Sequence, residues 1–223
     1  MSLTKLQDPS IRLTQYVEAI KFYLEHTTLK IVYIDNSGVD IEQEFEGSSC
    51  EGRLETLCFF GNDYDRNLGK GYGEMQIIEY GLEHSLFLKS ATFIFKITGR
   101  LKVLNINKFA DQLIYPSPIE VMVDMKGMLF YADSRFFGGI PAFYEILIGN
   151  KNLIDDSKDH TFEQALSKAV CIALIKNYKY RLLKYLPRYC GVSGTLNERY
   201  PSGLLYWIPR DIKQRLRYYL MSV

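Results

Sequence analysis

The sequence contains few cysteines and no long apolar run. Its four cysteines form no Cys-x-x-Cys pair and have no histidine at ligand spacing, so no structural zinc site is expected. Free thiols in a reducing cytoplasm fit this usage best. No stretch approaches the roughly 20 apolar residues that span a bilayer. The N-terminus also lacks the basic region and apolar stretch of a signal peptide, so a cytoplasmic location is expected.

The common phosphate-binding loops are missing as well. The stretch "GKGYGE" at residues 69–74 places glycines and Lys70 at the start of a predicted helix. Backbone N–H groups and the helix dipole favour an anion at such a position. The stretch is neither a Walker A loop nor a G-x-G-x-x-G motif. A glycine-rich helix entry without a ligand explains it equally well.

Acidic residues are scarce in the last part of the chain. The formal net charge is +1, yet residues 176–223 hold ten Lys and Arg against two acids, Glu198 and Asp211. Aromatic residues alternate with these cations, as in "YKYRLLKYLPRY". Such a segment can bind anionic lipid headgroups. A solvated amphipathic helix that closes the domain is an equally good interpretation, and nucleic acid is not expected as a partner.

Helical and strand patterns alternate along the first 130 residues. Apolar spacing predicts a helix over residues 9–24, with Asp8 as its cap and Pro9 in its first turn. This alternation predicts an α/β domain with a mostly parallel sheet flanked by helices, over residues 1–175. Residues 176–223 are predicted to form a basic, aromatic, helical C-terminal segment packed on that domain. The other predicted elements are strands over 29–34, 54–60, 93–97 and 128–132, and helices over 71–88, 141–149 and 161–183.

The predicted strands end in polar clusters: "DNS", "GND", "KITGR" and "ADSR". The carboxyl ends of parallel strands share one rim, where ligands bind in such folds. Lys96 and Arg100 flank the Thr98-Gly99 turn, so their cationic groups are expected at one point, able to stabilise a departing diphosphate. The alternative is an edge-strand lysine and a solvent-facing arginine.

Two carboxylates are candidates for chemistry. Asp133 at the rim can hold a sugar hydroxyl or a divalent ion, or form a structural pair with Arg135. Glu163 follows Thr161, a predicted helix cap. A helix N-terminus favours the charged carboxylate, which suits a general base less well than burial does. From this pattern alone, Glu163 is a first-turn helix residue more often than a catalyst.

Four stretches resemble, in order, a family of bacterial glycosyltransferases from capsule and lipopolysaccharide O-antigen gene clusters. They are "RLTQYVEAIKFYL…KIVYIDNSG", "GKGYGEMQIIEYGL", "FIFKITGRLKVLNI" and "FYADSRFF", within residues 10–170. The resemblance implies a GT-A-type fold and a nucleotide-diphospho-sugar donor, with a UDP-sugar favoured. It also implies transfer to a growing saccharide, often lipid-linked. Such folds usually open with a strand ahead of the first helix. The sequence begins nearly at that helix, so either it is truncated or this member lacks the strand.

The resemblance also assigns site residues. Lys96 and Arg100 lie where many GT-A enzymes carry an Asp-x-Asp metal motif, which is absent. They are expected to replace a metal, and a divalent cation, Mn²⁺ or Mg²⁺, stays open as a cofactor. Glu163 is the expected base in an inverting reaction, with Asp133 as a second catalytic candidate. The expected donor-binding residues are Asp35, Asn36, Lys70, Glu74, Lys96, Thr98, Gly99, Arg100, Ser134 and Arg135.

Two other function classes stay open. One is a non-catalytic, degenerate transferase-like binding module of polysaccharide assembly. Its distinguishing features are the missing first strand and the missing Asp-x-Asp motif. The other is a nucleotidyltransferase, which needs a pair of metal-binding carboxylates on the rim, where only Asp133 is well placed.

Overall fold

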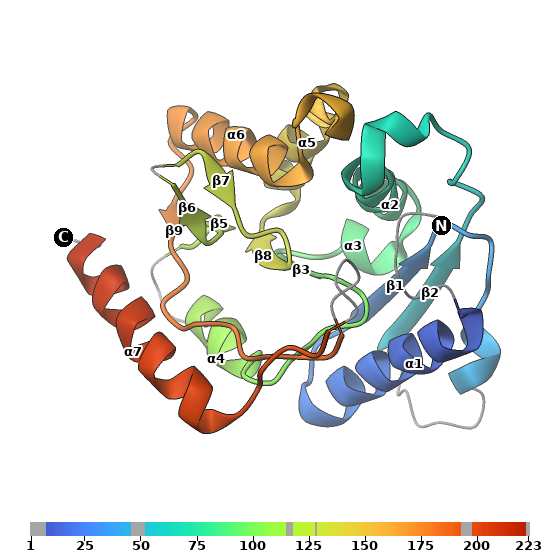
Figure 1. Ribbon diagram of the computed structural model, residues 1–223, viewed down its shortest axis with the longest axis horizontal. Helices are drawn as coiled ribbons and strands as arrows, with labels where there is room; N and C mark the ends of the chain where they lie inside the picture. Colours follow the sequence, from blue (N-terminus) through green and yellow to red (C-terminus); the bar gives the residue numbers. More distant parts are fainter. Residues whose placement is uncertain (1–7, 46–51, 115–117, 128, 193–197, 222–223) are drawn as a thin grey trace.

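The protein is a mixed α/β structure with short strands (Figure 1). The computed structural model describes residues 8–45, 52–114, 118–127, 129–192 and 198–221. The helices are α1 (Pro9–His26), α2 (Gly69–His84), α3 (Leu86–Lys89), α4 (Asn107–Ala110), α5 (Pro141–Ile148), α6 (Phe162–Ile175) and α7 (Leu204–Met221). The strands are β1 (Ile31–Asp35), β2 (Leu54–Cys58), β3 (Ile94–Ile97), β4 (Lys102–Val103), β5 (Val121–Met122), β6 (Met125–Lys126), β7 (Tyr131–Ala132), β8 (Phe136–Gly139), β9 (Tyr180–Arg181) and β10 (Tyr189–Cys190).

The strands form several small sheets of mixed direction. The largest has the order β3-β8-β5-β9, in which only β5 and β9 run parallel. A separate sheet pairs β1 with β2 in parallel. The pairs β10–β4 and β6–β7 are antiparallel. The prediction of a mostly parallel sheet is therefore wrong for the main sheet.

The segment from 131 to 139 causes this difference. The strand expected over 128–132 was predicted to end at the polar cluster, and β7 does end there, but a further strand that was not predicted, β8, follows the turn at 133–135. After the turn, β8 runs antiparallel between β3 and β5. Gly138 and Gly139 fit there because a Cβ would crowd the rings of Phe95 and Phe143.

Helix α1 shows how local sequence sets the boundaries. The Asp8 side chain accepts hydrogen bonds from the backbone N–H groups of Ser10, at 2.9 Å, and Ile11, at 3.3 Å. Pro9 occupies the first turn, where no intrahelical N–H bond is lost. The predicted cap is confirmed. At the other end, the Thr27 hydroxyl donates to the Tyr23 carbonyl, at 2.7 Å.

The core lies on both faces of the main sheet. Because side chains alternate along a strand, Val121 and Phe137 face a cluster with α5 and α6, while Met122 and Phe136 face a second cluster. Helices α2, α5 and α6 lie on one side of the molecule, and α1, α4 and α7 on the other (Figure 1). Opposite sheet faces thus carry opposite helix layers.

The C-terminal segment is only partly helical. The helix expected over 161–183 ends at Ile175, and the chain then enters β9 and β10 before α7 begins. Asn177, just beyond that end, has a φ of 64°. Within the described residues, every helix is too short or too polar to span a lipid bilayer. The strand expected to be missing ahead of α1 concerns residues that, apart from Asp8, lie outside those described.

Candidate functional site

A cavity of about 690 Å³, here called the cleft, gathers most of the predicted site residues. It lies between the start of α2, the turn that follows β3, the turn between β7 and β8, and the start of α6. Most of the predicted rim residues therefore do meet, although the strands that lead to them are not all parallel. Nine of the twelve candidates line the cleft: Lys70, Glu74, Thr98, Gly99, Arg100, Asp133, Ser134, Arg135 and Glu163.

The glycines of "GKGYGE" bring the start of α2 close to α6. Gly69 has a φ of 80°, which glycine adopts readily, and a Cβ there would overlap the Asp156 carboxylate. A Cβ at Gly71 would lie 2.8 Å from the Cβ of Phe162, at the start of α6. These glycines therefore serve close packing, and that packing places Lys70 in the cleft.

Two cations in the cleft repel each other. Burial lowers the pKa of Lys70, Asp156 partly offsets this, and the charge of Arg100 lowers the pKa further. Arg100 is only 8% exposed, and its guanidinium donates to the neutral Gln15 amide oxygen, at 3.2 Å. Among the described residues, no carboxylate lies within 4.0 Å of either cation. Both groups line the cleft and are suited to an anion.

Lys96 is placed differently from Arg100. Its side chain is 11% exposed and forms an ion pair with Glu74. The same ammonium donates to the Ser134 carbonyl, at 2.7 Å, and to the Thr98 hydroxyl, at 3.4 Å. An ammonium has three donors, so all of them have protein partners. The two cations of "KITGR" do not converge on one point, contrary to expectation.

Asp133 is held by two cations. It accepts hydrogen bonds from Arg135 Nε, at 2.8 Å, and from Lys126 Nζ, at 3.0 Å. Burial would raise the pKa of Asp133, but Arg135 and Lys126 hold it well below its usual range. The Arg135 guanidinium also lies over the ring of Tyr189, at 4.5 Å. This is the arrangement of the structural pair, and it leaves Asp133 a weak base.

Glu163 is a carboxylate at the wall of the cleft. It lies in the first turn of α6 and accepts a hydrogen bond from the Ser134 hydroxyl, at 2.7 Å. Among the described residues, no cation forms an ion pair with it. Thr161 is the N-cap residue of α6, as predicted, but its hydroxyl makes no capping bond and has no partner among the described residues.

Asp156 lines the cleft but was not among the site residues predicted from the sequence. This residue begins a short 3₁₀ turn, Asp156–Lys158, that packs against the start of α2. Burial raises the pKa of Asp156, and the nearby charge of Glu163 raises it further, while the backbone N–H of Lys70 opposes both. The cleft thus holds two close carboxylates. The acidic run "DDSKDH" was the available signal, but only tertiary packing brings it to the cleft.

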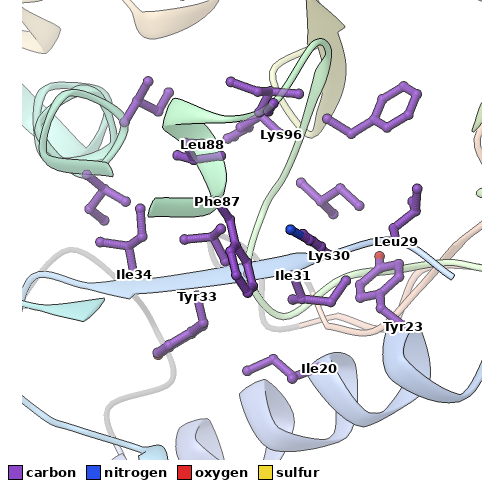
Figure 2. A pocket seen from close by; sticks show the side chains of 18 of the residues that line it. Ile20, Tyr23, Leu29, Lys30, Ile31, Tyr33, Ile34, Phe87, Leu88 and Lys96 are labelled. Carbon is purple, nitrogen blue, oxygen red and sulfur yellow. The ribbon is translucent and has the colours of Figure 1, made fainter. Parts of the chain in front are cut away.

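Asp35 and Asn36 lie outside the cleft. The Asp35 carboxylate accepts from the backbone N–H of Ser37, at 2.6 Å, which closes a local turn. Asn36 is 1% exposed, and neither its amide nitrogen nor its amide oxygen has a partner among the described residues. Both residues line a second cavity. Figure 2 shows this cavity, which Lys96 also lines.

In the described part of the chain, no three His, Cys, Asp or Glu side chains are grouped to hold a metal ion. Cys58, Cys171 and Cys190 are free thiols, and Cys50 lies outside the described residues. A comparison with models of known protein families finds no match, and a search of characterised proteins finds no significant relative. The family resemblance therefore stays an expectation.

Proposed function

We propose that the protein is a glycosyltransferase that binds a nucleotide-diphospho-sugar in the cleft. The observation that carries this proposal is the pair Lys70 and Arg100, two cations that repel each other and lack a carboxylate partner among the described residues. Arg100 is the buried member of the pair, and a buried cation without a counter-ion is costly. A diphosphate would remove that cost and would gain hydrogen bonds from the guanidinium fork.

The other cleft residues fit roles around this anion. Lys96 acts as a positioning residue, because its contacts with Glu74 and the Ser134 carbonyl tie the start of α2 to the turn at 133–135. Tyr64 and Tyr72 are near neighbours at the start of α2, with ring centroids 5.2 Å apart. Tyr64 lines the cleft, where an aromatic face suits a nucleobase. The proposal includes a GT-A-like architecture, which the mixed α/β arrangement accommodates.

The proposed reaction is a single displacement. Glu163, oriented by the Ser134 hydroxyl, removes the proton from an acceptor hydroxyl. The acceptor oxygen forms a bond to the anomeric carbon while the bond from that carbon to the diphosphate oxygen breaks. Lys70 and Arg100 stabilise the negative charge that develops on the leaving diphosphate. Because the oxygen attacks opposite the leaving group, the configuration inverts.

A donor assay tests the proposal. The protein is incubated with UDP-, GDP- and CMP-sugars, with and without Mn²⁺, and release of the nucleotide is measured with saccharide acceptors present. Turnover with one nucleotide-diphospho-sugar is the expected result. If UDP or GDP raises the unfolding temperature but no sugar nucleotide is consumed, the chain is the non-catalytic binding module. No binding and no turnover would contradict both functions.

We also propose that the protein acts at an anionic membrane surface, on the cytoplasmic side. Helix α7 packs on the domain through Trp207, Asp211, Gln214 and Tyr218. Another face of α7 carries exposed apolar side chains, including Leu205, 93% exposed, and others that recur at helical spacing. These are Ile208, Ile212, Leu216, Tyr219 and Leu220.

Cations border this apolar face. Arg210 and Lys213 form no ion pair with another described residue, and Arg210 stacks on the Tyr206 ring at 3.5 Å. An exposed apolar stripe bordered by basic residues is typical of helices that lie in a lipid headgroup layer. With α7 in the headgroup layer, the protein would lie at the membrane surface, where a lipid-linked acceptor is within reach.

Vesicle sedimentation tests the membrane proposal. The protein should bind vesicles in which about one lipid in three is phosphatidylglycerol and bind neutral phosphatidylcholine vesicles weakly, because basic residues add about 1 kcal/mol each near an anionic surface. Replacing Leu205 and Leu220 with serine should abolish binding without unfolding, since both side chains are exposed. Equal binding by this variant would contradict the assignment.

A further inference from the structure

Two buried carboxylates lie close together at one end of the β6–β7 pair. Asp124 precedes β6 and Asp133 follows β7, and the backbone N–H of Asp133 donates to the Asp124 carbonyl, at 3.0 Å. Asp124 is 4% exposed and Asp133 is 8% exposed. Like charges at opposite positions of neighbouring strands are destabilising, and a buried charge is costly unless it is paired. Both carboxylates therefore depend on the cations around them.

Three cations from different parts of the chain neutralise these carboxylates. Lys126 lies between them, with Nζ 3.0 Å from Asp133 Oδ2 and 3.5 Å from Asp124 Oδ2. Arg135 donates to Asp133 through Nε, at 2.8 Å. Arg217 of α7 donates to Asp124 through Nη1, at 2.8 Å. The result is a continuous series of alternating charges, here called the charge chain: Arg217, Asp124, Lys126, Asp133 and Arg135.

One end of the charge chain belongs to the wall of the cleft. Lys126, Asp133 and Arg135 all line the cleft. The Asp133 carboxylate also accepts from the backbone N–H of Arg135, at 3.2 Å, and so closes the turn at 133–135. The Ser134 hydroxyl in this turn donates to Glu163, at 2.7 Å. The position of Asp133 therefore affects the orientation of Glu163.

The other end of the charge chain is on the C-terminal helix. Among the described residues, Asp124 forms ion pairs with Arg217 and Lys126 only. With Arg217 removed, Asp124 would be a buried carboxylate that has lost its closest cation, which is strongly destabilising. Lys126 would then move toward Asp124 and away from Asp133. Arg217 therefore keeps Lys126 on Asp133.

We propose that Arg217 is a positioning residue of the cleft, which acts through Asp124 and Lys126 on the turn at 133–135. The helix at the far end of the sequence thereby takes part in building the cleft. The expected effect on turnover rests on the proposed function. The expected effect on the turn does not, because it follows from the ion pairs alone.

A double-mutant cycle measures the link between the two ends of the charge chain. Wild type, Arg217→Gln, Asp133→Asn and the double variant are unfolded with urea. The loss in the folding equilibrium constant caused by Asp133→Asn should be at least about fivefold smaller in the Arg217→Gln background, because Lys126 has already left Asp133. Arg217→Lys keeps a cation beside Asp124 and should restore the wild-type loss. Equal losses in wild type and Arg217→Gln would overturn the proposal.

Asp124→Asn should give a coupling of the opposite sign. Without the Asp124 carboxylate, Lys126 serves Asp133 alone, so Asp133→Asn should cause a larger loss in this background than in wild type. This arm decides the question if Arg217→Gln does not fold. An equal or smaller loss would overturn the charge chain.

Gln214→Ala is the matched control on α7. Gln214 also ties α7 to the domain, through a hydrogen bond to the Leu183 carbonyl at 2.6 Å, but it has no bond to the charge chain. Its effect should therefore add to that of Asp133→Asn. Fluorescence of Trp207, the single tryptophan and a buried residue of α7, checks that the helix stays docked. Coupling as large as that of Arg217→Gln would overturn the assignment to Arg217.

Hydrogen exchange and kinetics test the effect on the cleft. Exchange of the Arg135 amide should be at least about tenfold faster in Arg217→Gln than in wild type, and unchanged in Gln214→Ala. In Arg217→Gln, kcat for transfer should fall at least about tenfold, because the turn that orients Glu163 has shifted. UDP affinity should stay the same, since Lys70 and Arg100 are untouched.

The outcomes separate this proposal from the proposed function. Absence of turnover in wild type would contradict the proposed function, and the unfolding and exchange results would then decide on Arg217. Coupling in the cycle together with wild-type exchange at Arg135 would overturn the positioning role. Faster exchange with an unchanged kcat in an active enzyme would overturn the step from the turn to Glu163.

Discussion

The cleft and the second cavity, here called the slot and about 570 Å³ in volume, are similar in size and opposite in construction. The cleft is walled by turns and helix starts, and its charges outnumber their partners at Lys70 and Arg100. The slot is walled by β1, β3 and faces of neighbouring helices, and most of its lining side chains are apolar. Cationic side chains without a carboxylate partner favour an anion in the cleft, whereas apolar walls do not. The chemistry of the lining residues thus distinguishes the two cavities.

The largest expected effect is on catalysis in the cleft. Glu163→Gln keeps the size of the side chain and its bond with Ser134, but the amide cannot accept a proton. We expect kcat for transfer to fall by at least about 100-fold, while UDP affinity stays unchanged. Glu145→Gln, on the exposed side of α5, is the matched control and should behave as wild type. An active Glu163→Gln enzyme would point to Asp156 as the base.

The next effect compares the slot with the packed core. Leu147 is fully buried, whereas Leu88 borders the slot and is half-buried. Leu147→Ala should lower the free energy of unfolding by about 3 kcal/mol, and Leu88→Ala by less than about 1.5 kcal/mol, because its surroundings are already incompletely packed. Urea denaturation measures both. Equal losses would mean that the slot is packed as tightly as the core.

The smallest effect is a pH dependence at Asp133. Although burial opposes ionisation, Arg135 and Lys126 hold the pKa of Asp133 below its usual range. Its stabilising contribution is therefore complete above the ordinary pKa of about 4 and is lost progressively as the pH falls from there toward the lowered pKa of the folded protein. Asp133→Asn should cost about 2 kcal/mol at pH 7 and less at pH 3.

Thermal unfolding between pH 7 and pH 3 checks this prediction. The curves of wild type and Asp133→Asn should approach each other toward the acid end, because only in wild type does protonation of Asp133 in the unfolded chain favour unfolding as the pH falls. Curves that stay parallel over the whole range would show that Asp133 does not carry the acid sensitivity.

Local features could be read from the sequence. Asp8 and Pro9 define the start of α1 because the cap uses neighbouring residues only. The gathering of most candidates in one cleft was also predictable, since polar clusters after strands meet at a rim. The pairing direction was not predictable: an apolar run such as Phe136–Phe137 looks the same in a parallel and an antiparallel strand.

Side-chain direction and long-range packing set the other limit. Lys96 and Arg100 are four residues apart, but one faces Glu74 on α2 and the other faces Gln15 on α1. Sequence spacing carries no information about these partners. Asp156 reaches the cleft only because its short turn packs against α2.

Titration of UDP into the protein by calorimetry tests the central claim most directly. Wild type should bind, and Lys70→Met and Arg100→Gln should each weaken binding at least tenfold, which is about 1.4 kcal/mol. Lys21→Met, which removes an exposed cation on α1, should leave the affinity unchanged. Wild-type affinity in both cleft variants, with folding intact, would contradict the claim that these two cations hold a diphosphate.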